Sequence, residues 1–105
     1  MITCINVKKA KGFIYAFMTV MDFKYFAFPD NIIFTTSAGQ ISTAFINHEF
    51  RHLQQYEKDG IIFYFLKWWY EYFTKGYANI SYELEAKAVE NEPNYYKGDI
   101  VYFNN

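Results

Sequence analysis

The chain has 105 residues, enough for one compact domain spanning residues 1–105 and too few for two. Hydrophobic residues make up 52% of it and charged residues 20%, which excludes intrinsic disorder. The net charge is −1 and no basic patch stands out, so we expect no nucleic-acid partner. Aromatic residues reach 24%, and we expect their packing to stabilise the modest core of so short a chain.

Cysteine usage and the N-terminal segment favour a cytoplasmic protein. Cys4 is the only cysteine, so no internal disulfide can form, which fits a reducing compartment. Three lysines within residues 8–11 precede the apolar stretch 12–21 as in a signal peptide. However, Asp22 and Lys24 follow, without a small-x-small cleavage site. Secretion and incorporation into a virion are the less favoured alternatives.

The first 40 residues are rich in residue types that favour strands. Tyr25–Phe28 and Ile32–Thr36 flank the turn-forming tripeptide Pro29-Asp30-Asn31, which predicts a β-hairpin. The apolar segment Phe13–Met21 fits either a strand or a short helix.

Helix signals begin after residue 40. Ser42 or Thr43 is a suitable N-cap and Asp59-Gly60 a suitable stop, which predicts a helix of about four turns. A second helix is predicted over Ile61–Lys75, ending at Gly76. We expect its aromatic segment, 61–73, to lie mainly in the core. The alternative is a peripheral membrane contact or a protein contact through this helix.

A third helix is predicted to start between Asn79 and Ser81 and to end before Pro93. The tail offers a turn at 97–99 and a short strand over Ile100–Phe103. The predicted fold class is therefore α+β, with a short N-terminal β-hairpin or sheet packed on three helices.

The first of these helices carries the sequence His-Glu-x-x-His. Because residues four apart share one helical face, His48 and His52 can both reach one metal ion. Two neutral imidazoles suit Zn²⁺, and Glu49 is placed to accept a proton from a water on that metal. Both histidines of the chain fall within the motif. The pattern predicts a catalytic zinc site.

Such a site needs a third protein ligand, which must be a carboxylate here because no further histidine is available. The third predicted helix supplies Glu83 and Glu85, each with an alanine three residues later that would permit close approach of the helices. The two glutamates point to different helical faces, and periodicity does not decide between them.

The two motifs together resemble the gluzincin class of zinc metallopeptidases, which pairs His-Glu-x-x-His with a later Glu-x-x-Ala. They are closer still to small bacterial and phage metallopeptidases with the pattern Asn-His-Glu-x-x-His-x-x-Gln-Gln, an aromatic helix, and Asn-Ile-Ser-aromatic-Glu-x-Glu-Ala. In this chain the three segments are 47–55, 61–73 and 79–86. The resemblance covers about residues 23–92.

The resemblance implies a minimal zincin-like fold with a Zn²⁺ cofactor. It implies that Glu83 is the third ligand, because the family glutamate precedes the alanine by three residues. It also implies that the strand Ile32–Thr36 is the sheet edge along which a peptide or protein substrate would lie.

One position departs from the gluzincin pattern. Many gluzincins place an aspartate after that alanine to orient a ligand histidine, where this chain has Lys87. We expect Gln55 or Asn47 to take this part, with Glu85 as a further neighbour of the metal ligands.

The predicted function is hydrolysis of peptide bonds by a zinc-activated water, with Glu49 as the general base. The alternative is an interaction or virion module that keeps zinc for stability and has weak or no activity. Peptide hydrolysis also needs a donor for the oxyanion, and four tyrosines are candidates: Tyr77, Tyr82, Tyr95 and Tyr96.

Overall fold

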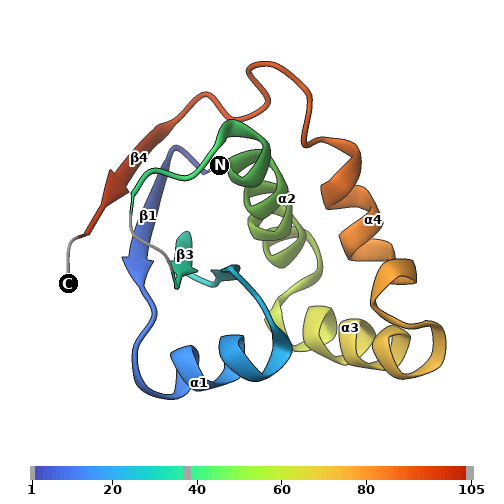
Figure 1. Cartoon of the computed structure of the whole chain (residues 1–105). Coiled ribbons are helices and arrows are strands. Elements are labelled where there is room, and N and C mark those ends of the chain that lie inside the picture. Colours follow the sequence, from blue (N-terminus) through green and yellow to red (C-terminus); the bar gives the residue numbers. More distant parts are fainter. Residues whose placement is uncertain (1, 37–38, 104–105) are drawn as a thin grey trace.

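A computed structural model of the chain describes residues 2–36 and 39–103. Within these residues the chain forms a four-stranded sheet and four α-helices, which confirms the α+β class (Figure 1). In chain order the elements are β1 (Cys4–Lys9), α1 (Gly12–Met21), β2 (Tyr25–Phe28), β3 (Ile32–Thr35), α2 (Thr43–Asp59), α3 (Ile61–Lys75), the 3₁₀ helix η1 (Tyr77–Asn79), α4 (Ser81–Ala88) and β4 (Asp99–Tyr102).

The sheet has the strand order β2-β3-β1-β4. Strands β2 and β3 pair antiparallel, which confirms the predicted hairpin. Its turn places Asp30 and Asn31 at φ angles of 69° and 60°, a left-handed conformation that short polar side chains tolerate. Strand β1 lies parallel to both β3 and β4.

The expected hairpin on three helices is an incomplete description of the fold. The segment Phe13–Met21, for which the sequence allowed a strand or a helix, belongs to the helix α1, which is a fourth helix within the described residues. The sheet is also not purely N-terminal, because β4 from the end of the chain adds to β1. Parallel pairing joins segments far apart in sequence and has no local turn signal, which is why the residue pattern did not predict it.

The expectation that Ile32–Thr36 forms the sheet edge is wrong, because β3 lies between β2 and β1. The outer strand beside the helices is β2. Its Ala27 donates its N–H to Glu49 Oε1 (3.1 Å), and its carbonyl accepts from the Tyr56 hydroxyl (2.7 Å). Both partners are on α2, so the edge of β2 is attached directly to the helix with the His-Glu-x-x-His motif.

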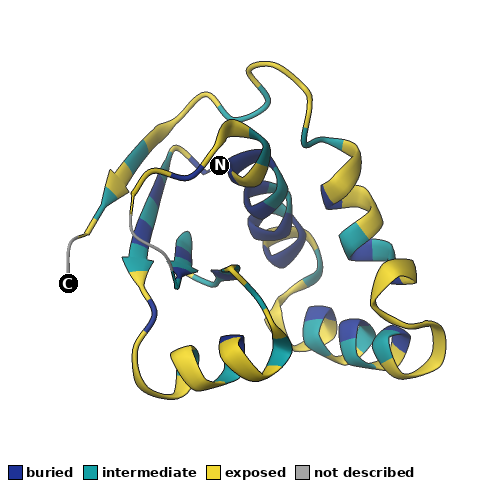
Figure 2. Ribbon diagram, viewed as in Figure 1, coloured by how far each residue is buried: buried dark blue, intermediate teal, exposed yellow. Residues whose placement is uncertain are grey.

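The core lies between the sheet and α2. Ile5 and Val7 alternate with less buried residues along β1 and point to the same side as the fully buried Ile33 of β3. From α2, residues at helical spacing meet them, including Phe50 and Leu53. Figure 2 shows the contrast between α2, with its many buried residues, and the largely exposed α1.

Helix boundaries follow the predicted caps. The Ser42 side chain accepts from the N–H of Phe45 at the start of α2. Gly60 and Gly76 end α2 and α3 with φ angles of 80° and 82°, which glycine adopts without strain. Among the described residues, no helix is both long enough and apolar enough to cross a membrane.

Helix α4 begins as predicted, but its N-terminus is capped from another helix. Glu71 of α3 accepts hydrogen bonds from both the backbone N–H and the hydroxyl of Ser81, each 2.8 Å long. This contact holds the start of α4 against α3 and so helps to set where α4 lies relative to α2.

Candidate metal centre

The two histidines lie one turn apart on the same side of α2, with their Nε2 atoms 3.2 Å apart. Glu49 lies beside them, its Oε2 3.8 Å from His48 Nε2. The donor atoms of these three residues all lie within 4.8 Å of one another, so the group could hold a metal ion. The helix presents them because its other side, with Phe50 and Leu53, is buried in the core.

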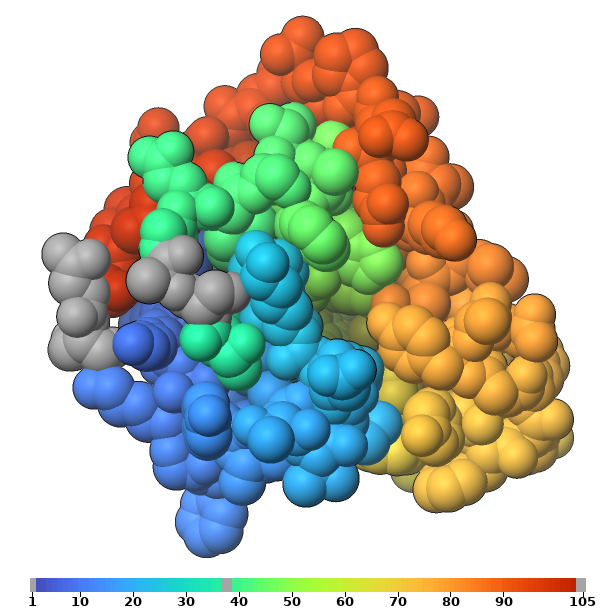
Figure 3. Space-filling view, viewed as in Figure 1, coloured from blue at the N-terminus to red at the C-terminus, as the bar shows by residue number. Residues whose placement is uncertain are grey.

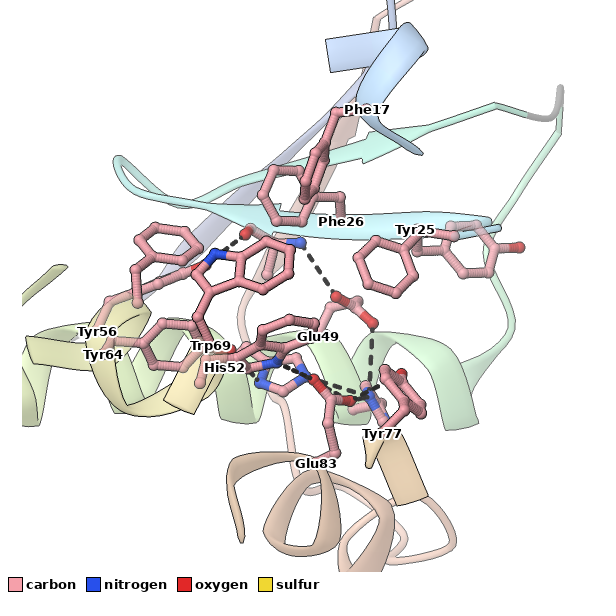
Figure 4. Close-up of a pocket in the computed structure, with 15 residues that line it drawn as sticks. Phe17, Tyr25, Phe26, Glu49, His52, Tyr56, Tyr64, Trp69, Tyr77 and Glu83 are labelled. Carbon is pink, nitrogen blue, oxygen red and sulfur yellow. Dashed lines mark hydrogen bonds and ion pairs between the residues drawn. The ribbon is translucent and has the colours of Figure 1, made fainter. Parts of the chain in front are cut away.

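Helix α4 brings Glu83 to the same place. Its Oε1 lies 3.1 Å from His48 Nε2 and 3.3 Å from His52 Nε2. Two donors fix this carboxylate: Trp68 Nε1 contacts Oε2 at 3.0 Å, and the Tyr77 hydroxyl contacts Oε1 at 3.1 Å. Figure 4 shows Glu83 reaching up from α4 toward the imidazoles.

The outer nitrogen of each imidazole is also held. His48 Nδ1 lies 2.7 Å from Glu90 Oε2, and His52 Nδ1 lies 2.8 Å from Gln55 Oε1. Because a carboxylate or amide oxygen only accepts, each Nδ1 must donate. The neutral imidazoles then carry their hydrogen on Nδ1 and direct the lone pairs of Nε2 toward Glu83.

Asn47 directs its side-chain amide to backbone carbonyls and not to an imidazole. Its side-chain amide, 1% exposed, donates to the carbonyl oxygens of Val89, Glu90 and Glu92 at 3.0–3.2 Å. These bonds hold the segment after α4 against α2. Asn47 therefore acts on the site indirectly, by placing Glu90 within reach of His48.

Lys87, the residue that departs from the expected aspartate, does not take part in the cluster, and neither does Glu85. Lys87 is exposed, and the carboxylate that contacts His48 belongs to Glu90, three residues further along the chain. Glu85 lies outside the cluster, with its side chain 48% exposed. Its Oε1 accepts from Gln55 Nε2 at 3.0 Å and from Arg51 at 3.3 Å.

Glu49 is held separately from the other carboxylates. Its Oε1 accepts the N–H of Ala27, while Oε2 faces the imidazoles. Burial raises the pKa of Glu49 above the usual range, and this effect outweighs the opposing charges of His52 and His48. A buried carboxylate with a raised pKa is a better proton acceptor than an exposed one.

The cluster as a whole attracts positive charge. Burial lowers the pKa of His48, but Glu83, Glu49 and Glu90 outweigh it and raise the pKa to about 9. The pKa of His52 is raised in the same way, since Glu83 and Glu49 outweigh its burial. Burial raises the pKa of Glu83, but the charges and hydrogen bonds of the two imidazoles outweigh it and hold this pKa well below the usual range. Protons and metal cations favour the same atoms here.

The arrangement of the donor atoms fits zinc. His48 Nε2, His52 Nε2 and Glu83 Oε1 form a triangle with sides of 3.1, 3.2 and 3.3 Å. Tetrahedral zinc, with bonds of about 2.0–2.1 Å, spaces its ligands about 3.3 Å apart. Two Nε2 lone pairs 3.2 Å apart repel each other unless a proton or a metal ion lies between them. Nitrogen and oxygen donors in this set suit zinc better than calcium or magnesium, which prefer oxygen alone.

An aromatic cleft with about 470 Å³ of empty space, including its open mouth, leads to this cluster (Figure 4). Glu49, His52 and Glu83 line it at the inner end. Its walls are formed by rings from α1, from the loop between α1 and β2, from β2 and from α3: Phe17, Phe23, Tyr25, Phe26, Phe65, Trp68 and Trp69. The walls of the cleft beside the cluster are therefore largely apolar.

Of the four candidate tyrosines, Tyr77 lies in the cleft, where its hydroxyl donates to Glu83. The other three hydroxyls bond elsewhere, to Asp59, Gln54 and Asp99.

Sequence reasoning missed the contacts of Glu90, Trp68 and Tyr64, whose hydroxyl lies 3.1 Å from His52 Nδ1. Trp68 and Tyr64 sit in a helix expected to be plain core, and Glu90 lies beyond the end of α4. No local pattern marked any of them.

Comparisons with known proteins identify no family: no family model, curated protein or solved structure matches the chain significantly.

Proposed function

We propose that the chain is a zinc metallopeptidase built as a single zincin-like domain over residues 1–105. The observation that carries this proposal is the triangle of His48, His52 and Glu83 donor atoms with Glu49 beside it, at the inner end of a cleft. The first three residues would hold the metal. When bound, zinc supplies a Lewis acid that acidifies a water molecule and polarises a carbonyl group.

The protein's own residues would do the proton transfer. Glu49 Oε2 faces the cluster and would take a proton from the attacking water, while Oε1 stays on the Ala27 N–H. The same carboxyl group would then give that proton to the leaving amine. The raised pKa of Glu49 suits both steps, because it brings proton uptake and release closer to neutral pH.

Two other contacts support catalysis of this kind. Glu90 and Gln55 would keep the imidazoles oriented through their Nδ1 atoms. The Tyr77 hydroxyl lies at the edge of the cleft and would donate to the developing oxyanion when it leaves Glu83. The cytoplasmic location expected from the single cysteine belongs to the same proposal.

The substitution Glu49→Gln tests the proposal. Glutamine keeps an oxygen for the Ala27 N–H, so the fold and the metal content should not change, whereas the proton acceptor is lost. We expect about one zinc per chain in both proteins by elemental analysis, and cleavage of a fluorogenic peptide library by the wild type only. Glu92→Gln, which alters an exposed carboxylate, is the matched control and should cleave normally.

Two results would count against this function. Equal cleavage by wild type and Glu49→Gln would mean that another group, or a contaminant, performs the reaction. A zinc-loaded wild type that cleaves no member of the library would favour the zinc-holding interaction module instead.

A further inference from the structure

Two neighbouring helices carry large apolar side chains on their outer surface. We call this surface the apolar ridge and define it by five residues that are 67–93% exposed. They are Phe13 and Val20 of α1, and Ile62, Leu66 and Phe73 of α3. Single exposed apolar side chains are common on protein surfaces, but a group of large ones on adjacent helices marks an interaction surface.

One ring contact links the two parts of the ridge. On α1, Phe13, Phe17 and Val20 recur at helical spacing, so Phe17 lies on the ridge side of the helix. On α3, Trp69 lies on the same side as the ridge residues one turn away. The rings of Phe17 and Trp69 meet edge-on with centroids 6.4 Å apart. Figure 1 shows α1 and α3 along the same lower edge of the molecule.

Charge is distributed unevenly along the chain. Residues 1–28 carry four lysines and one aspartate, and α3 carries two lysines and one glutamate, a net charge of +4 in a chain of net charge −1. Two of these lysines are directed away from the ridge, because Lys8 lies over the Phe103 ring and Lys67 over the Tyr82 ring. The glutamate of α3 is Glu71, which is buried and bonded to Ser81. Negative charge is thus concentrated in the other parts of the chain.

Lysines stand next to the ridge itself. Lys11 directly precedes α1 and is exposed, and Lys24 follows it, with Asp22 as the one acidic residue between them. Lysine side chains beside an apolar surface can extend their ammonium groups toward lipid phosphates while their methylene stems stay in contact with acyl chains.

We propose that the apolar ridge docks the protein on the surface of an anionic lipid bilayer. Lys11 and Lys24, exposed at the two ends of α1, give the ridge positively charged neighbours, which suit an anionic surface. Figure 3 shows α1 protruding at the lower end of the molecule. A protruding surface inserts into a soft interface more readily than it fills a pocket. Insertion of apolar side chains with flanking lysines is how interfacial helices bind such membranes.

Docking would bring the cleft close to the lipid. Phe17 and Trp69 belong both to the seam of the ridge and to the cleft walls. The channel to the candidate metal centre would therefore start near the membrane surface. The proposal itself does not depend on the metal or on hydrolysis.

The test is cosedimentation of the full chain with vesicles of phosphatidylcholine, alone or with 30% phosphatidylglycerol, in 0.1 M salt. We expect at least tenfold tighter binding to the anionic vesicles. The pair Leu66→Ser and Phe73→Ser should weaken this binding at least tenfold. The control pair Leu84→Ser and Val101→Ser removes exposed apolar side chains from α4 and β4 and should bind like the wild type.

A second pair of substitutions tests the charge contribution. Lys11→Gln and Lys24→Gln should each weaken binding to anionic vesicles about fivefold, in line with the contribution of one lysine near a charged surface. Binding to neutral vesicles should not change. Circular dichroism of each variant checks that the helices remain folded.

Three results would overturn the proposal. The first is no binding to anionic vesicles, and the second is equal loss in the ridge pair and the control pair. The third is a concentration-dependent dimer in sedimentation velocity that the ridge pair dissociates, without vesicle binding by the wild type. That result would assign the ridge to contact between copies.

Discussion

Substitution of Glu83 is the most direct test of the candidate metal centre. Its Oε1 lies 3.1 Å from His48 Nε2 and 3.3 Å from His52 Nε2. Glu83→Gln therefore replaces the carboxylate among three candidate ligands by an uncharged amide, whose oxygen is a weaker metal ligand. Structural zinc sites with four ligands bind with about 10–16 kcal/mol, or about 3 kcal/mol per ligand. We therefore expect zinc affinity to fall on the order of 100-fold.

The same loss should appear in thermal stability. At a zinc concentration of about 1,000 times the wild-type Kd, binding stabilises the fold by about 4.1 kcal/mol. A 100-fold weaker site retains about 1.4 kcal/mol under these conditions. For a chain of this length, the difference of about 2.7 kcal/mol corresponds to a Tm lower by on the order of 10 °C.

Competition with a chromophoric chelator measures the affinity, and scanning calorimetry measures the Tm with and without zinc. Glutamine keeps an oxygen for only one of two donors, because Trp68 contacts Oε2 of Glu83 and Tyr77 contacts Oε1. The gain in Tm on adding zinc is therefore compared between the two proteins, each measured against its own metal-free form. Glu85→Gln is the matched control, because Glu85 is half-exposed and bonds Arg51 and Gln55 outside the cluster. If Glu85→Gln lost as much affinity as Glu83→Gln, the assignment of the third ligand would be wrong.

Three further substitutions test contacts that support the site and the fold. Asn47→Ala removes three hydrogen bonds to the backbone carbonyls that follow α4. The free energy of unfolding, measured by urea denaturation, should fall by about 1–3 kcal/mol. An unchanged denaturation midpoint would contradict this. Gly98→Ala should cost about 1–3 kcal/mol, because its Cβ would clash with the Thr3 carbonyl oxygen and separate β4 from β1. Zinc affinity should change less than twofold. For Glu71, burial raises the pKa, but the hydrogen bonds from Ser81 outweigh it and lower the pKa below the usual 4.5. The resulting stabilisation is complete above the pKa of Glu71 in the unfolded chain and is lost as the pH falls through its lower pKa in the folded chain. Glu71→Gln should therefore be less stable than wild type at pH 7, and the difference should shrink as the pH falls below 4.5. A difference that stays constant from neutral to acid pH would refute the argument.

The sequence alone determined the local structure of this protein. Caps, glycine stops and turn residues predicted α2, α3, the start of α4 and the hairpin of β2 and β3 close to their observed bounds. Helical spacing likewise predicted that His48 and His52 share one side of α2. These features depend on residues within about one or two turns of one another, so their information is present in short segments of chain.

Only the tertiary structure decided which segments meet. In it, β1 pairs with both β3 and β4, and the edge strand beside the helices is β2 and not the expected β3. Glu83 lies against the imidazoles, whereas Glu85 lies outside the cluster. The tertiary structure also placed Glu90 against His48. Periodicity gives the face of each helix, but the distance between helices depends on the packing of all their side chains. Parallel pairing and interhelical contacts therefore leave no signature in any single segment.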